Sequence, residues 1–335
     1  MIREPLERLM KNWMELGEES VAGAAISRGE ALSVLQSPDD ELLAVMQAAF
    51  IPRQRHFGRA VNLHVLRNAK SGMCSENCAF CSQSVMAESG VERYRMQSVD
   101  EIVEGARDAR SIGAVKYCIV TSTRSPSDLE LQTVCDAVRR IKKEVPLHLC
   151  ASLGLLNAAQ AEVLAAAGVN RYNHNLETSR RFFPTICQTH TFEERVATVK
   201  AAKAAGMEAC CGGIVGLGET LEDRTDWAFA LRELEVEAIP VNFFDPRPGT
   251  ALSAVPRLKP AECLRALAMV RLVNPSRDIR VAGGREVNLR SLQPLALYAA
   301  NSIFTNGYLT TPGQGYSADL AMLGDAGFTV GKLEA

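Results

Sequence analysis

Residues 146–175 read PLHLCASLGLLNAAQAEVLAAAGVNRYNHN, and this segment contains the repeating unit of the fold. A short apolar run at 146–152 predicts a β-strand, an alanine-rich stretch at 157–167 predicts a helix, and a second strand follows at 169–175. Gly168 separates this helix from the second strand, at a position where helix ends favour glycine. A strand, a helix and a strand joined by short linkers predict a parallel βαβ unit.

The same alternation continues on both sides of this segment. Further strands are expected at 61–67, 115–121, 207–215, 238–244, 279–283 and 301–305. Amphipathic helices are expected at 99–112, 127–144, 191–205, 220–235, 260–273 and 287–299, with a final helix near 317–326. Eight βα units within about 270 residues fit a closed barrel better than an open, doubly wound sheet. The sequence therefore predicts an α/β fold, namely a (β/α)8 TIM-type barrel.

The N-terminal part of the chain does not follow the barrel pattern and reads as helical. Ser27 and Glu30 have the spacing of a capping box, which marks the start of a helix. We therefore divide the chain into an N-terminal helical extension at 1–58, a barrel domain at 59–320 and a short C-terminal tail at 321–335.

The composition is that of an ordinary globular protein, with 47% hydrophobic residues, 23% charged residues and a net charge of −2. The charge excludes nucleic acid as the main partner, and the apolar runs are too short for a membrane span. The first twenty residues are charged and do not resemble a signal peptide. Ten cysteines in such a chain indicate a reducing compartment, so we expect a cytoplasmic protein.

Cys74, Cys78 and Cys81 form a C-x₃-C-x₂-C run in one polar loop after the first expected strand. Three thiolates can bind three irons of a cubane cluster, which leaves the fourth iron open for a small molecule, whereas electron carriers supply four cysteines. A zinc site or unrelated buried thiols are the alternatives. Zinc sites use paired C-x₂-C halves, and no second half lies nearby. The run therefore indicates an iron–sulfur cluster that takes part in chemistry.

A second group of thiols lies on the expected strands themselves. Cys118, Cys150 and Cys210 fall on the second, third and fifth strands, and Arg280 falls on the seventh. Alternate residues of every barrel strand point inward, so these side chains could meet in the lumen as a second metal site. The alternative is that each cysteine is a small buried hydrophobic residue. The remaining helical thiols, Cys135 and Cys263, are interpreted as structural.

Several blocks of sequence resemble a known family. The run CSENCAFCSQ at 74–83 is similar to the signature of radical S-adenosylmethionine (SAM) enzymes. Four further blocks resemble the biotin synthase family: YNHNLET at 172–178, GGIVGLGE at 212–219, RVAGGRE at 280–286, and NSIF at 301–304 with LTTP at 309–312. The loop specifies only the superfamily, whereas YNHNLET and SIF…LTTP together specify the family.

The resemblance implies a sulfur-transferring reaction. Cys74, Cys78 and Cys81 would hold a [4Fe–4S] cluster that binds SAM at its open iron. Cys118, Cys150, Cys210 and Arg280 match the ligands of an auxiliary [2Fe–2S] cluster, whose sulfide would be inserted between C6 and C9 of dethiobiotin to give biotin. The clusters would carry the chemistry, with no acid or base residue. The implied partners are a flavodoxin or ferredoxin electron donor, iron–sulfur assembly proteins, and a second copy of the chain in a homodimer.

The resemblance also implies which residues bind the small molecules. The positions that match SAM contacts are Asn175, Glu177, Gly212, Gly213, Ile214 and Glu219. Those that match substrate contacts are Asn173, Asn175 and Asn242 for the ureido ring, and Thr310 and Thr311 for the carboxylate. Amide side chains both donate and accept hydrogen bonds, as a urea requires.

Two thiols depart from the pattern of the best-known branch of the family. We hypothesise that Cys187 lies within reach of the auxiliary cluster and could enlarge it; otherwise it is a bystander. Cys211 follows Cys210 directly and should face away from the lumen, because adjacent strand residues point in opposite directions. Competing interpretations are another radical SAM barrel enzyme of the hydrogenase-maturase or methylornithine-synthase type, a non-catalytic iron–sulfur carrier, and a metal-free barrel with core thiols.

Overall fold

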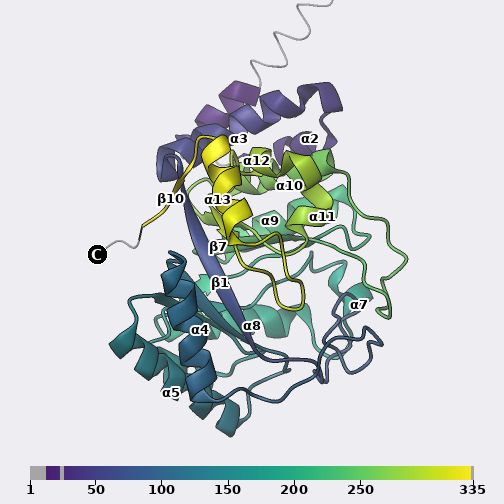
Figure 1. Ribbon diagram of the computed structural model, residues 1–335. Helices are drawn as coiled ribbons and strands as arrows, with labels where there is room; N and C mark the ends of the chain where they lie inside the picture. The colour runs from purple at the N-terminus through teal and green to yellow at the C-terminus, as the bar shows by residue number, and fades with distance from the viewer. Residues whose placement is uncertain (1–12, 23–25, 333–335) are drawn as a thin grey trace, which may run out of the picture.

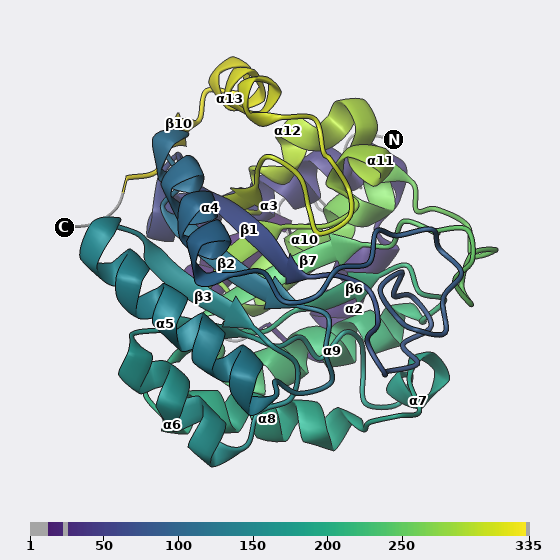
Figure 2. The same ribbon diagram turned by 60° about the horizontal axis from the view of Figure 1, so that its bottom comes forward.

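The computed structural model describes residues 13–22 and 26–332, and its centre is a closed barrel of parallel strands (Figures 1 and 2). The strands are β1 (Ala60–Lys70), β2 (Lys116–Thr121), β3 (His148–Ser152), β4 (Arg171–Asn173), β5 (Glu208–Cys210), β6 (Gly213–Val215), β7 (Ala238–Phe243), β8 (Asp278–Val281), β9 (Ser302–Phe304) and β10 (Thr329–Val330). The pairing of Leu63 on β1 with Ile303 on β9 closes the barrel.

The fifth position of the barrel is shared by two short strands, β5 and β6, which both pair with β7. Gly212 lies between them, and a Cβ atom there would approach the carbonyl oxygen of Pro240 to 1.9 Å. Only glycine fits this close approach, so the single strand predicted at 207–215 bends and divides. With β5 and β6 counted as one position, the barrel has eight positions, and the predicted (β/α)8 fold is confirmed.

Helices join consecutive strands along the outside of the barrel (Figure 2). They are α4 (Val99–Ser111), α5 (Asp128–Glu144), α6 (Ala158–Ala167), α8 (Phe192–Ala204), α9 (Leu221–Glu233) and α10 (Pro260–Val273). The first five of these begin with a capping box, for example Ser127 with Glu130. Such caps satisfy N–H groups that lack partners within the helix and so stabilise these helix starts.

Two helical regions differ from the expectation. The single helix expected at 287–299 is divided into α11 (Arg285–Leu289), the 3₁₀ turn η2 (Arg290–Leu292) and α12 (Gln293–Ala296). Arg290 has a φ of 51°, which interrupts the helix, and Pro294 cannot donate a backbone hydrogen bond. A short helix that was not predicted, α7 (Phe183–Ile186), lies between β4 and α8.

The N-terminal helices pack on α10 outside the barrel. Within the described residues, 13–21 are helical and are followed by α2 (Arg28–Gln36), the 3₁₀ turn η1 (Asp39–Glu41) and α3 (Leu42–Phe57), while residues 1–12 lie outside them. The predicted capping box of Ser27 and Glu30 is confirmed. Ser20 donates a hydrogen bond to the carbonyl of Leu272 at the end of α10 (3.0 Å), and so the extension is fixed to the barrel.

The C-terminal segment continues past the barrel as α13 (Tyr316–Asp325) and β10. Strand β10 pairs in parallel with the first residues of β1, and the side chains of Leu323 and Phe328 are buried. Residues 333–335 of the expected tail lie outside the described residues. In the part of the chain that the structure describes, none of the helices combines the length and apolar character needed to cross a bilayer.

The hydrophobic core fills the shell between strands and helices, whereas the lumen of the barrel is polar. Leu149, Tyr172 and Ile239 are among the side chains buried in the shell. The lumen contains buried charges such as Asp278 and Arg280, which are 8% and 3% exposed. Buried charges are costly unless they are paired, so their concentration inside the barrel marks the place where function is to be sought.

Candidate active site

A cavity of about 540 Å³ opens at the carboxyl ends of the strands. Its walls come from the loop after β1, from the ends of the barrel strands, and from the loop at 307–314 after β9. Active sites of (β/α)8 barrels lie at this end. Cys74, Cys78 and Cys81 line one side of the cavity, while Cys118 and Cys150 line it deeper in the barrel. Five of the six predicted thiols therefore face one space, and Cys210 is not among the described lining residues.

Backbone hydrogen bonds fix the shape of the three-cysteine loop. Cys74 donates to the carbonyl of Gln83 (3.1 Å), and Val85 donates to the carbonyl of Cys74 (2.8 Å). Burial raises the pKa of the Cys74 thiol and raises that of Cys81 to about 11. Since a metal-bound thiol is deprotonated outright, a cationic cluster is the kind of group that would hold these thiols as thiolates. The three free thiols on one wall fit a three-cysteine cluster site.

The deeper thiols are positioned by strand register. Cys118 on β2 is paired directly with Cys150 on β3. A shared hydrogen bond raises the pKa of Cys118 well above its usual range and lowers that of Cys150. Across the lumen, Arg280 Nη1 on β8 donates to Cys210 Sγ on β5 at 3.6 Å. The structure thus brings together the four residues that the sequence placed on four separate strands.

Nε and Nη2 of Arg280 are buried and make no hydrogen bond to the described residues; Nη2 lies 3.5 Å from the carboxylate of Asp278, whereas Nε has no such neighbour among the ion pairs of the described residues. A buried guanidinium with an unpartnered donor requires an electron-rich acceptor beside it. The sulfides and thiolates of an iron–sulfur cluster would supply such acceptors, and three thiols lie on β2, β3 and β5 of the same barrel. The residues present therefore fit an auxiliary cluster in the lumen.

A network of charges closes the lumen below these thiols. Asp278 accepts hydrogen bonds from Arg171 (3.0 Å) and Ser302 (2.6 Å), and it lies 3.4 Å from the ammonium of Lys116. Burial opposes the charge of Asp278, but Lys116, Arg280 and Arg171 outweigh it and hold the pKa of this carboxyl well below its usual range. The network holds Arg280 in place and separates the lumen from the amino ends of the strands.

Asn175 and Glu177, the predicted SAM contacts, follow β4 and line the cavity. The amide of Asn175 donates to Glu177 Oε2 (3.3 Å) and accepts from the N–H of Gly212 (3.0 Å). Arg195 Nη1 donates to the carbonyl of Asn175 (2.8 Å) and lies 3.5 Å from Glu177. Burial raises the pKa of Glu177, and Arg195 opposes that shift. The carboxylate is therefore oriented toward the cavity by neighbours on both sides.

The glycine-rich segment plays a different part from that of Asn175 and Glu177. Of its predicted contacts, Ile214 lines the cavity, whereas Gly212, Gly213 and Glu219 are not among the described lining residues. A Cβ atom on Gly213 would approach the carbonyl oxygen of Glu177 to 2.4 Å. The Glu219 carboxylate accepts from the N–H groups of Gly216 (2.7 Å) and Leu217 (2.6 Å). These residues shape the wall, and the positions of Glu177 and Ile214 follow from that shape.

The predicted substrate contacts all line the cavity. Asn173 Nδ2 donates to Ser152 Oγ (3.3 Å). Asn242 donates to the carbonyl of Gly213 (3.0 Å) and accepts from the N–H of Gly283 (2.8 Å). Each amide group of Asn242 thus has one protein partner and keeps further hydrogen-bonding capacity, because an amide offers two donors and two lone pairs.

Thr310 and Thr311 lie in the loop after β9, next to a cation that sequence analysis missed. Arg247 Nη2 donates to Thr311 Oγ1 (2.8 Å) and pairs with Asp245 (2.8 Å). Tyr308 and Thr311 exchange two backbone hydrogen bonds of 2.8 Å. Arg247 lies in the loop after β7, and a charged residue in such a loop was the available signal.

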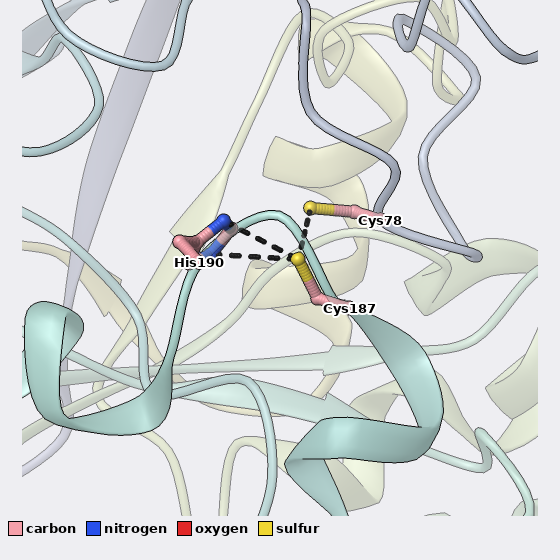
Figure 3. A group of neighbouring side chains, drawn as sticks. All are labelled: Cys78, Cys187 and His190. Atoms are coloured by element: carbon pink, nitrogen blue, oxygen red, sulfur yellow. Dashed lines mark hydrogen bonds between the residues drawn. The ribbon is translucent and has the colours of Figure 1, made fainter.

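Cys187 is placed differently from our hypothesis. Its Sγ lies 3.7 Å from Sγ of Cys78, beside the three-cysteine loop (Figure 3). His190 Nδ1 lies 3.3 Å from the same sulfur. The hydrogen bond from Cys78, aided by those of His190 and Thr189, lowers the pKa of Cys187 to about 3. The sequence could not show this, because α7 and its contact with the loop were not expected.

The other thiols belong to the hydrophobic shell. Cys211 is fully buried among apolar side chains such as Leu176 and Ile239, on the opposite side of the strand from Cys210. Cys135 and Cys263 are fully buried on α5 and α10. These three thiols therefore have structural surroundings, as the alternation of strand residues and the helix positions indicated.

Solved structures of low sequence identity have the same fold. A crystal structure of methylornithine synthase aligns with a TM-score of 0.82 at 20% identity, and covers 95% of this chain and 97% of that one. A maturase of the [FeFe]-hydrogenase also aligns with a TM-score of 0.82, at 14% identity over 97% of this chain and 76% of that one. At these identities the likeness concerns the barrel alone.

Two family models match consecutive parts of the sequence. Residues 70–231 match the radical SAM superfamily, and residues 240–329 match the biotin and thiamin synthesis associated domain. The biotin synthase of Salinibacter ruber is 58% identical over 319 residues, which cover 95% of this chain and 89% of the relative. That of Bacillus subtilis is 48% identical over 325 residues, 97% of each chain. Together with the cavity and its two groups of thiols, these matches assign the chain to the biotin synthase family of radical SAM enzymes.

Proposed function

We propose that this chain converts dethiobiotin to biotin by inserting one sulfur atom between C6 and C9. The observation that carries the proposal is the single cavity in which Cys74, Cys78 and Cys81 at the mouth face Cys118 and Cys150 in the lumen. The polar side chains expected to bind substrate lie along the same walls. Membership of the family supports the reaction and its electron requirement.

The thiols and Arg280 would hold the two inorganic groups. Cys74, Cys78 and Cys81 would bind a [4Fe–4S] cluster, and Cys118, Cys150, Cys210 and Arg280 would bind an auxiliary [2Fe–2S] cluster. When bound, the first cluster and SAM supply the radical that removes hydrogen from C9 and C6, and the auxiliary cluster supplies sulfur. The Nε–H group of Arg280, which makes no hydrogen bond to the described residues, would donate to a sulfur atom of the auxiliary group.

The protein side chains would orient SAM between these two groups. The carboxylate of Glu177 suits the ribose hydroxyls, since a carboxylate accepts hydrogen bonds from both oxygens of a diol. Asn175 and Arg195 hold that carboxylate in place. The walls of the barrel exclude water, which protects reactive intermediates from side reactions.

The substrate would lie with its two polar ends in different hydrogen-bonding surroundings. Asn173 and Asn242 have free amide capacity for the ureido ring, and Thr310 and Thr311 offer hydroxyl groups to the carboxylate. Arg247 adds a positive charge beside Thr311, which makes that end of the cavity suitable for an anion. This arrangement would bring C6 and C9 toward the lumen.

The proposal also covers the partner proteins, the oligomeric state, the cellular location and the domain division of the chain. A flavodoxin or ferredoxin would donate the electron, iron–sulfur assembly proteins would rebuild the auxiliary cluster, and two copies of the chain would form a homodimer in the cytoplasm. We propose residues 1–58 as an extension of a barrel domain at 59–320. The extension contacts α10 through Ser20, and the segment at 321–332 contacts β1.

The experiment that tests the function is an anaerobic reaction of the iron- and sulfide-reconstituted protein with SAM, dethiobiotin and a flavodoxin reducing system. We expect biotin, methionine and 5′-deoxyadenosine by mass spectrometry. Formation of 5′-deoxyadenosine with no biotin from protein that holds both clusters would contradict the proposed substrate. Protein that binds iron but releases no 5′-deoxyadenosine from SAM would be a carrier.

A further inference from the structure

Cys187 and Cys78 form a pair of thiols that the proposed reaction does not use. Their sulfur atoms are 3.7 Å apart, although the residues are far apart in the sequence (Figure 3). Cys78 lines the cavity, whereas Cys187 is only 4% exposed and lies behind it. One member of the pair therefore faces the cavity, and the other is buried.

Hydrogen bonds between two loops hold this pair together. Ala79 donates to the carbonyl of Ile186 (2.8 Å), next to Cys78 on one side and Cys187 on the other. Asn77 Oδ1 accepts from the N–H groups of Gln188 (2.9 Å) and Thr189 (3.2 Å). The residues on both sides of the thiols are thus connected, so the short S···S distance is a consequence of the fold.

The distance argues against Cys187 as a fourth ligand of the cluster. Two thiolates on one tetrahedral metal, with bonds of about 2.3 Å, lie roughly 3.8 Å apart. The observed 3.7 Å would therefore place Cys187 on the same iron as Cys78, and the open iron of a three-cysteine cluster is a different one.

The surroundings of His190 argue against a zinc site made by Cys78, Cys187 and His190, whose ligand atoms all lie within 4.8 Å of one another. Arg195 Nε donates to His190 Nε2 at 2.9 Å, so Nε2 carries no proton. The proton is therefore on Nδ1, the atom that contacts the carboxylate of Glu76. Nδ1 has no lone pair for a metal in this arrangement, and two thiols remain as the reactive pair.

We propose that Cys78 and Cys187 form a reversible disulfide when the chain lacks its [4Fe–4S] cluster. The oxidant is a low-molecular-weight disulfide such as oxidised glutathione. Cys78 attacks one sulfur of this molecule and releases one thiolate, which leaves a mixed disulfide on Cys78. Cys187 then attacks Sγ of Cys78 and releases the second thiolate, so two protein thiols are oxidised and one small disulfide is reduced to two thiols.

The disulfide would prevent cluster loading, because it removes one of three iron ligands. This consequence rests on the proposed role of Cys78, whereas formation of the disulfide does not. Reduction by a dithiol would restore the site. The pair would also protect Cys78 from irreversible oxidation beyond the sulfenic acid, since a neighbouring thiol converts that species to a disulfide.

Peptide mapping tests the proposal directly. The full-length chain, freed of iron anaerobically and fully reduced, is treated with oxidised glutathione, alkylated and digested with trypsin without reduction. Trypsin releases the three loop cysteines in the peptide 71–93 and Cys187 in the peptide 182–195. We expect the linked pair of these peptides, with fragmentation placing the bond at Cys78, in more than half of the oxidised chains. Links confined within 71–93, or only mixed disulfides, would overturn the proposal.

Variants and loading experiments provide the controls. Cys187→Ser and Cys187→Ala are both expected to lose the linked pair, whereas Cys211→Ser, which removes another buried thiol, keeps it. Circular dichroism shows whether each of the two Cys187 variants is folded, and only a folded variant is used for the comparison. Chains loaded with the cluster should not form the link, and oxidised chains should bind iron only after reduction. If the link forms and iron still binds fully, Cys78 is not an iron ligand, and the proposed function fails while the disulfide stands.

Discussion

The two groups of thiols in this barrel are built in opposite ways. Cys74, Cys78 and Cys81 lie within eight consecutive residues of one loop, and loop hydrogen bonds give them their shape. Cys118, Cys150 and Cys210 each come from a different strand, and only the register of the barrel brings them together. The mouth site is thus local in sequence, whereas the lumen site depends on the whole fold.

This difference agrees with the chemistry that each site would perform. The mouth site faces the open end of the cavity, where SAM and an electron donor must arrive and leave. The lumen site rests on the charge network of Asp278 and has its guanidinium fixed beside the thiols. A group that gives up a sulfur atom must stay in register with its substrate, and rigid strands position such groups better than loops. The following predictions test this division.

Loss of a mouth thiol should have the largest effect. Cys74→Ala removes one of three ligands, so we expect neither 5′-deoxyadenosine nor biotin above background. Mass spectrometry of the anaerobic reaction measures both products. Cys135→Ala removes a buried helix thiol of the shell and should retain both. Normal release of 5′-deoxyadenosine by the Cys74 variant would show that the loop is not the SAM-cleaving site.

Loss of a lumen thiol should stop the formation of biotin without stopping the release of 5′-deoxyadenosine. Cys150→Ala leaves the mouth site intact, and we therefore expect some SAM cleavage to continue while biotin formation stops. Iron and sulfide analysis with Mössbauer spectroscopy should show loss of the auxiliary cluster alone. Biotin at the normal yield would contradict the assignment of the sulfur source to the lumen.

The charge network should contribute to stability as well as to position. Asp278→Asn leaves Lys116, Arg171 and Arg280 without their shared anion, and breaking a buried ion pair in this way costs about 3–5 kcal/mol. Urea denaturation of the cluster-free chain measures the loss. Asp226→Asn, at an exposed pair with Arg28, should leave the midpoint nearly unchanged. Equal effects of the two substitutions would mean that Asp278 does not stabilise the lumen.

A substitution between the two sites should have the smallest effect. Glu177→Gln removes a charge proposed to bind the ribose hydroxyls, and a hydrogen bond to a charged group is worth about 1.5–3 kcal/mol. We expect the KM for SAM to rise about tenfold, with kcat changed less. Glu222→Gln, in the first turn of α9, is the control. An unchanged KM would place the ribose elsewhere.

The sequence predicted the barrel well, for physical reasons, and it placed the cysteines of both groups in the loop and on the strands where the structure has them. Strand and helix periods alternate clearly, and the capping box of Ser27 and Glu30 marks the start of α2. Cys118, Cys150, Cys210 and Arg280 were found because barrel strands alternate their side chains inward. In each case a rule about residues close in sequence, combined with the repeat of βα units around the barrel, was sufficient for the prediction.

The remaining features depend on contacts that no local rule contains. The position of Cys187 follows from α7, whose four residues are too few to give a periodic signal. The role of Glu219 as a cap for its own loop, and of Arg247 as the neighbour of Thr311, appears only when side-chain distances are known. The division of β5 from β6 at Gly212 has the same origin, because the interfering carbonyl belongs to Pro240 on another strand.

Closure of the barrel between β1 and β9 has a consequence for how the protein is made. The pairing of Leu63 with Ile303 joins residues from opposite ends of the chain, and β10 then adds to the start of β1. Such distant pairings form late and slow the folding of a chain, because the long loop between them must close first. During synthesis the mouth loop leaves the ribosome long before the lumen is complete. The three-cysteine loop is therefore complete in the emerging chain before the strands that carry Cys210 and Arg280 and the closing strand β9 have been made.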